Sequence, residues 1–365
     1  MTERIRELRD FFTVEKRHRS VRKQPEDPAV LTETFMRENV PEMQRAVLRL
    51  KYMLDNETPV VFKNEQIALT RTIPQVPELY TPGEMEQIRS IYRLHERGEV
   101  CNINVDYSML LDKGFDEKRA EIRTALLKFS KRNDTASCEY LEYLLSILDS
   151  VEGLAERYRK KAEEVGNLIV AESFRQIPAG PPRTFLEALQ MLRLIHFTMW
   201  CGNNYHNTLG RFDQYMYKYL KKDMDDGILD YDSALELVEE FFISLNRDSD
   251  LYPGMQQGDN GQSLVLGGLD PDGTDSYNLL SELCLKASLE LKLIDPKINL
   301  RVSSSTPPER FELATLLTRQ GLGFPQYSND DIVIEGLTRL GYDREAVYSD
   351  RAPAQPCIIY GIRKI

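Results

Sequence analysis

The feature that most constrains the fold is an alternation of strand-like and helix-like segments that begins after about Gln176. Three short runs have the composition of strands: "QSLVLGG" (262–268), which is predicted to be buried, the strand-like "KINLRVS" (297–303) and the extended "FPQYSN" (324–329). Each is followed by a helical pattern, in 276–292, 307–323 and 330–341. Crossings of this length suit α/β packing, so the pattern predicts an α/β fold with its sites in the polar loops that follow the strands.

The first half of the chain has a mainly helical pattern. Apolar residues recur at helical spacing in 34–54 and again in 139–166. Two proline-containing stretches between them, 58–69 and 72–84, predict connections or short strands over a helical body. We therefore divide the chain into three parts: a mainly helical part, 1–175, an α/β part, 176–349, and an atypical tail, 350–365.

The charge balance excludes several classes of partner. The net charge is -11, so the chain has no electrostatic reason to bind nucleic acid or an anionic membrane. The basic stretch from Arg4 to Lys23 is better explained as a solvated helix face than as a nucleic-acid patch.

Hydrophobic residues make up 41% of the chain without a run long enough to span a bilayer. The five cysteines form no C-x-x-C pair, which favours free thiols in the cytoplasm over disulfides or a zinc site, and we expect no metal.

Three polar loops supply candidate binding residues. The loop "CGNNYHNTLG" (201–210) contains Asn203, Asn204 and His206, although a lone histidine is more often structural than catalytic. The glycine-rich "QQGDNGQSLVLGG" (256–268) leads into a strand without a lysine. Close packing therefore explains its glycines better than a phosphate cradle does. Its polar members could still face a cavity: Gln257, Asn260 and Gln262.

The third loop, "QYSNDDIVIEGL" (326–337), precedes a helical pattern. Asn329, Asp330 and Asp331 are suited to capping that helix, and one of them can cap it while another points elsewhere. Upstream, the stretch that starts at Asp270 lacks the spacing of a calcium loop. It predicts instead a turn and a helix N-terminus with Asp275 or Ser276 near the cap.

Cys357 lies in the last segment, "DRAPAQPCIIYGIRKI" (350–365). No neighbouring cation before Arg363 would lower the pKa of its thiol, so it is an unpersuasive ionic nucleophile.

Taken together, several long segments resemble a glycyl radical enzyme of the pyruvate formate-lyase-like family. In chain order they are "CNINVDYSMLLDKGF" (101–115), "PPRTFLEALQM" (181–191), "GRFDQYMYKYL" (210–220), "GQSLVLGGLDPDGTDSYNLLSELCLKASL" (261–289), "KINLRVS" (297–303) and "QGLGFPQYSNDDIVIEGLTRLGYDREAV" (320–347). The resemblance implies a helical N-terminal region followed by about half of a ten-stranded α/β barrel, which is built from two five-stranded halves.

The resemblance also implies a radical mechanism. An iron–sulfur activating enzyme that uses S-adenosylmethionine takes a hydrogen from a backbone glycine. That glycyl radical passes its spin to a cysteine, and the resulting thiyl radical takes a hydrogen from the substrate. No bound cofactor is expected. A thiyl radical needs no lowered pKa, so Cys357 becomes the candidate catalytic residue. The implied substrate-binding residues are Asn203, Asn204, His206, Gln257, Gln262, Tyr327, Asn329 and Asp330.

Two departures from the family pattern concern the end of the chain. The residues around Cys357 do not match the D-Y-x-x-x-x-C type of loop, and the glycine loop of the R-V-x-G-Y kind is absent. We therefore expect the N-terminal portion of a radical lyase or acyltransferase, truncated and inactive alone, in a cytoplasmic homo-oligomer. The alternative is a non-catalytic subunit or assembly protein derived from the family. A third hypothesis is an unrelated, purely helical scaffold.

Overall fold

The computed structural model describes residues 1–24, 27, 29–91, 105–204, 207–251, 262–344 and 347. Its longer helices are α1 (Glu3–Arg9), α2 (Val30–Arg37), α3 (Glu42–Asn56), α4 (Pro82–Ile91), α6 (Gly114–Ser130), α7 (Thr135–Val165), α8 (Leu168–Gln176), α9 (Phe185–Cys201), α11 (Tyr217–Asp225), α12 (Tyr231–Asn246), α13 (Leu279–Leu291), α14 (Glu309–Thr318) and α15 (Asp330–Arg339). The short ones are η1 (Asp10–Val14), η2 (Arg17–Val21), α5 (Tyr107–Leu111), α10 (Phe212–Tyr215) and η3 (Ser249–Leu251). The strands are β1 (Ser263–Gly267), β2 (Lys297–Val302) and β3 (Gln326–Asn329).

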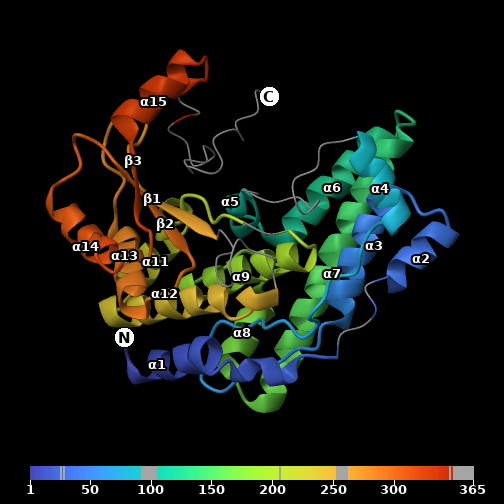
Figure 1. The fold of residues 1–365 in the computed structure, drawn as a ribbon, viewed down its shortest axis with the longest axis horizontal. Coiled ribbons are helices and arrows are strands. Elements are labelled where there is room, and N and C mark those ends of the chain that lie inside the picture. The colour runs from blue at the N-terminus through green and yellow to red at the C-terminus, as the bar shows by residue number, and fades with distance from the viewer. Residues whose placement is uncertain are drawn as a thin grey trace.

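The helices form a thick layer beside and beneath a small sheet (Figure 1). The long helix α7 packs against α3, α6 and α8, while α9 crosses the middle of the molecule and contacts α3, α8, α11 and α12. Side-chain caps set several helix starts: Asp134 accepts the Ser137 N–H ahead of α7, and Thr184 accepts the Glu187 N–H ahead of α9. No helix in the described ranges combines the length and the hydrophobicity needed to cross a bilayer.

The three strands are parallel and lie in the order β1-β2-β3. Helix α13 connects β1 to β2, and α14 connects β2 to β3, as expected for the alternating pattern after Gln176. Gly210 adds a parallel bridge to Leu264 on the other side of β1. The sheet excludes a purely helical scaffold.

One hydrophobic core joins the helical part to the sheet. It runs from Ile5 in α1, through Phe185 in α9 and Phe241 in α12, to Leu300 in β2 and Phe324 ahead of β3. The N-terminal helices therefore share one core with the sheet and do not pack as a separate unit.

The stretches predicted as connections or short strands, 58–69 and 72–84, contain no strand; they form connections and the start of α4. Side chains satisfy their backbone in place of a neighbouring strand. The Glu57 carboxylate accepts the Thr72 N–H at 2.7 Å, and the Gln190 side chain accepts the Ala68 N–H at 2.8 Å.

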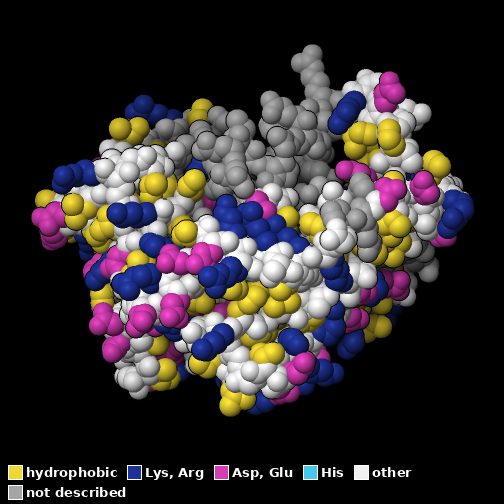
Figure 2. Space-filling view, turned by 60° about the horizontal axis from the view of Figure 1, so that its bottom comes forward, with side chains coloured by type: hydrophobic (Ala, Val, Ile, Leu, Met, Phe, Trp, Pro, Cys, Tyr) yellow, Lys and Arg dark blue, Asp and Glu magenta, His cyan; other side chains and the backbone are white. Residues whose placement is uncertain are grey.

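The prediction of a solvated helix face for the basic N-terminal stretch is wrong for Arg4, His18 and Arg22. Arg4 pairs with Glu236 and Glu240 of α12, and Arg22 pairs with Asp250 at 2.6 Å. His18 is fully buried, and burial lowers its pKa to about 4. The stretch docks on α12 and η3 because acidic side chains there match its charges. Figure 2 shows acidic and basic side chains close together over one face of the molecule.

Candidate functional site

The sheet has two chemically different faces. Ile298 and Leu300 of β2 belong to the hydrophobic core. Because side chains alternate along a strand, Asn299 and Arg301 point to the opposite face. The strand register places Ser328 of β3 level with Arg301. This second face is polar although its β2 residues are buried, and buried polar side chains that converge are typical of a binding site.

A buried ion pair closes the C-terminal end of the polar face. Arg301 donates from Nε to Asp330 Oδ1 at 2.9 Å and from Nη2 to Asp330 Oδ2 at 2.8 Å. The side chains are only 2% and 1% exposed, so the charges must satisfy each other. Asp330 Oδ2 also accepts the Leu269 N–H at 2.8 Å, which fixes the loop after β1.

Gly268 lies directly against this ion pair. Its φ of +96° is unfavourable for any residue with a side chain. A Cβ atom here would lie 2.7 Å from Arg301 Nε and 2.9 Å from Asp330 Oδ2. The loop therefore requires glycine for two reasons, the backbone conformation and the close approach of the ion pair.

Gly268→Ala should lower the free energy of unfolding by about 2–4 kcal/mol, because backbone strain and displacement of the ion pair add together. Gly273→Ala is the matched control. Its φ is +84°, but no atom of the described residues lies within 4 Å of where the alanine methyl group would be. Only the strain of about 1 kcal/mol then remains. Urea unfolding followed by circular dichroism compares the two. Equal losses of unfolding free energy in the two variants would show that the contact between residue 268 and the ion pair has no energetic effect.

A second buried carboxylate holds the end of β1. Asp213 Oδ2 accepts the Gly267 N–H at 2.7 Å and the Ser281 hydroxyl at 2.5 Å, and Arg211 donates to the Gly267 carbonyl at 3.0 Å. Burial raises the pKa of Asp213. The end of β1 is thus fixed by α10 and α13 as well as by the neighbouring strands. Ahead of α13, Asn278 is the N-cap and Asp275 accepts the Tyr277 N–H in the preceding turn, so Asp275 and Ser276 lie near the cap as predicted.

Three predicted binding residues lie at the C-terminal end of β3. Asn329 caps α15 by accepting the Asp331 N–H at 3.0 Å, while Asp330 turns back to Arg301. Asp331 accepts the Ser304 N–H at 2.7 Å. Tyr327 is level with Leu300, stacks on Phe311 of α14 and is 42% exposed, so it lies on the helix side of the sheet. Their contacts in the structure are with the protein itself, and their contact with substrate stays a prediction.

The other described candidates lie at the opposite end of the strands. Gln262 precedes β1 and donates to the Leu245 carbonyl at 2.8 Å and to Asp295 at 3.0 Å. Asn203 and Asn204 form the turn after α9, where Asn203 has φ of +64°. The five residues of β1 separate Gln262 from the Arg301–Asp330 pair by roughly 16 Å. The structure therefore divides the predicted set between two ends of the sheet.

The remaining predicted site residues, His206, Gln257 and Cys357, lie outside the described residues, as does Asn260. Within the described ranges, no group of three or more His, Cys, Asp and Glu side chains is arranged to hold a metal ion.

Sequence reasoning missed Asn299 and Arg301. A signal for them exists, because "KINLRV" alternates apolar and polar residues with the period of a strand. The run is predicted as a strand, but the polar half of its alternation is not used to place a site.

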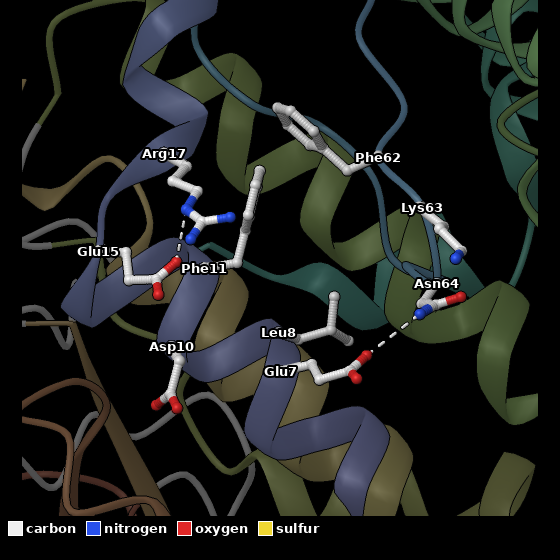
Figure 3. A pocket seen from close by; sticks show the side chains of 9 residues that line it. All are labelled: Glu7, Leu8, Asp10, Phe11, Glu15, Arg17, Phe62, Lys63 and Asn64. Carbon is white, nitrogen blue, oxygen red and sulfur yellow. Dashed lines mark hydrogen bonds and ion pairs between the residues drawn. The ribbon is translucent and has the colours of Figure 1, made fainter.

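A separate open groove of about 530 Å³ lies between the N-terminal stretch and residues 62–64. Figure 3 shows two contacts among its lining side chains: Arg17 with Glu15 at 2.6 Å and Asn64 with Glu7 at 3.4 Å. The groove is far along the chain from the polar face and shares no residue with it.

Comparison with known proteins defines the class. The model of the family described as "Pyruvate formate lyase-like" matches residues 75–351. The trans-4-hydroxy-L-proline dehydratase of Clostridioides difficile is 28% identical over 257 residues, and the isethionate sulfite-lyase of Nitratidesulfovibrio vulgaris is 30% identical over 261. A glycyl radical enzyme of Archaeoglobus fulgidus superposes with a TM-score of 0.77 at 21% identity. The chain belongs to the pyruvate formate lyase-like family of glycyl radical enzymes.

The extent of these matches confirms the predicted fold class. The superposition covers 95% of this chain and 54% of the Archaeoglobus fulgidus chain, so the structure corresponds in fold to about half of that glycyl radical enzyme chain. The two sequence matches each cover 63% of this chain but only 32% and 30% of the dehydratase and the sulfite-lyase. The chain therefore spans about a third of the length of these curated relatives.

Proposed function

We propose that this chain forms the first half of the active-site barrel of a glycyl radical lyase that eliminates a leaving group from a small hydroxylated substrate. The observation that carries the proposal is the buried polar face of β2, fixed by the Arg301–Asp330 pair, in a chain of this family. The relatives named above are a dehydratase and a sulfite-lyase, which favours elimination over acyl transfer.

The proposed partners follow from the mechanism. A cytoplasmic S-adenosylmethionine-dependent iron–sulfur enzyme would activate the complete barrel, and a cysteine, with Cys357 as the candidate, would carry the thiyl radical. The glycine loop expected for that radical is not found in these 365 residues. We accordingly propose that the chain alone is inactive, and that a homo-oligomer forms only around a completed barrel.

The isolated chain, incubated anaerobically with an activating enzyme and S-adenosylmethionine, should give no glycyl doublet in electron paramagnetic resonance. A clear doublet would contradict the proposed inactivity of the chain alone.

A chimera tests the reaction class directly. This chain is joined to the C-terminal portion of the trans-4-hydroxy-L-proline dehydratase, and radical formation is confirmed before turnover is measured. Elimination from trans-4-hydroxy-L-proline, isethionate or 1,2-propanediol is the expected result. Acetyl transfer from pyruvate to coenzyme A would instead assign an acyltransferase. A folded chimera that holds the radical and converts none of these compounds would refute the proposal.

A further inference from the structure

Two buried polar atoms on the same strand of the described structure have no hydrogen-bond partner. They are Oδ1 of Asn299 and Nη1 of Arg301, in side chains that belong to residues only 2% and 3% exposed. Buried polar groups without partners are rare in native proteins because each loses its hydrogen bonds to water. Two of them in adjacent inward positions of β2 therefore need an explanation.

The strand geometry brings these atoms onto one surface. Residues two apart on a strand lie on the same face about 7 Å apart. In β1, Val265 is level with Asn299 and Gly267 with Arg301. Directly after β1, Gly268 lies against the guanidinium, where a Cβ atom would be 2.9 Å from Arg301 Cζ. The two atoms without partners therefore lie on the face of the sheet opposite the hydrophobic core.

The structural requirements of the strand do not explain why these two polar atoms are buried without partners. The ion pair with Asp330 uses Nε and Nη2 of Arg301 and leaves Nη1 without a hydrogen-bond partner. Asn299 makes no hydrogen bond through Oδ1, and asparagine is disfavoured in strands, where a β-branched residue would pack better. Residues that weaken a fold in this way are characteristic of functional sites.

The two atoms have complementary chemistry. Nη1 of Arg301 presents N–H donors and positive charge to an oxyanion, and Oδ1 of Asn299 accepts a hydrogen bond from a hydroxyl group. We propose that Asn299 and Arg301 contact the substrate and select a small molecule that carries both a hydroxyl group and an anionic carboxylate or sulfonate. This inference rests on the proposed function and specifies its substrate class.

Matched ligands test the selection on the full 365-residue chain. Binding of isethionate is compared by titration calorimetry with ethanesulfonate, which lacks the hydroxyl, and with ethylene glycol, which lacks the anion. The carboxylate 3-hydroxypropionate distinguishes the two anions. Isethionate or 3-hydroxypropionate should bind at least about tenfold more tightly than either partial compound. No such preference in a folded chain overturns the proposal.

Two variants connect the preference to the residues. Asn299→Leu should abolish the advantage of the hydroxyl group and, without ligand, raise the unfolding midpoint by about 2 °C because an unpaired polar atom is removed. Arg301→Lys keeps a positive charge opposite Asp330 but should weaken binding of every anion. A lower midpoint for Asn299→Leu, with selectivity intact, would show that the amide is structural and would refute its role.

These measurements need no radical. If they fail while the chimera eliminates water or sulfite, the substrate contact is wrong and the reaction class stands. If they succeed while a radical-bearing chimera converts nothing, the site binds as inferred and the proposed reaction is wrong.

Discussion

Asp330→Asn is expected to lower the free energy of unfolding by about 3–5 kcal/mol, the largest effect that we predict at the sheet. The amide keeps the size of the carboxylate but removes the charge opposite Arg301, whose side chain is 2% exposed. A buried guanidinium without a counter-charge is costly, and the Leu269 N–H loses a charged acceptor as well. Urea unfolding of the full chain measures the loss.

Two further variants separate the ion pair from a general effect on α15. Glu335→Gln breaks the pair with Arg339 on the same helix, where the side chains are 62% and 77% exposed, and should cost less than about 0.5 kcal/mol. The double variant Arg301→Met with Asp330→Leu should be more stable than Asp330→Asn, because no buried charge is left unpaired. A double variant less stable than Asp330→Asn would contradict this account.

Arg247→Met, directly after α12, should lower the free energy of unfolding by a similar amount, about 3–5 kcal/mol. Arg247 lies 3.2 Å from Glu65 with both side chains fully buried, donates to the Ile67 carbonyl at 3.0 Å, and has its guanidinium 4.1 Å from the ring centre of Phe12. These contacts tie the N-terminal stretch to the end of α12. Removing them leaves Glu65 buried without its counter-charge.

The loss in Arg247→Met should depend on pH. Burial raises the pKa of Glu65 to about 7 in the folded protein. The folded state therefore binds the proton more tightly than the unfolded chain, and stability falls as the pH rises from about 4.5 towards 7. Without Arg247 this pKa rises further. The deficit relative to the wild type should then be about 1 kcal/mol larger at about pH 8 than at about pH 5.5.

Unfolding at the two pH values checks this, with Arg175→Met as the control. Arg175 is 58% exposed and pairs with Glu163 on the surface, so its loss should be small and independent of pH. Adding Glu65→Gln to Arg247→Met should remove the extra deficit at the higher pH. A deficit of the same size at both pH values would place the cost in lost packing and hydrogen bonds, without a contribution from the ionised carboxylate.

Local patterns predicted the elements of the sheet closely. The strands at 263–267, 297–302 and 326–329 lie inside the three runs that are predicted as strands. Asn329 caps α15, as its residue type suggests. These features depend on residues within a few positions of each other, so the sequence records them directly. The turn and helix N-terminus predicted around Asp275 and Ser276 are also present, with Asn278 as the N-cap.

The site was predicted less well, for a physical reason. The loops of 202–204 and 327–331 both contain polar residues, but whether two loops lie at the same end of a sheet depends on strand direction and register. The same holds for Asp330: its sequence neighbours suggest a cap, and only Arg301, 29 positions away, makes it an ion-pair partner.

The sequence by itself determined the α/β class, the family, the strand positions and the helices that follow the strands, because these follow from short-range periodicity and from long ordered motifs. Only the tertiary structure decided which charges are buried and paired, that the basic N-terminal stretch docks on α12, and that Asn299 and Arg301 share an inward polar face. Those properties arise from contacts between distant segments, where burial strengthens electrostatic interactions and makes an unpaired polar atom costly.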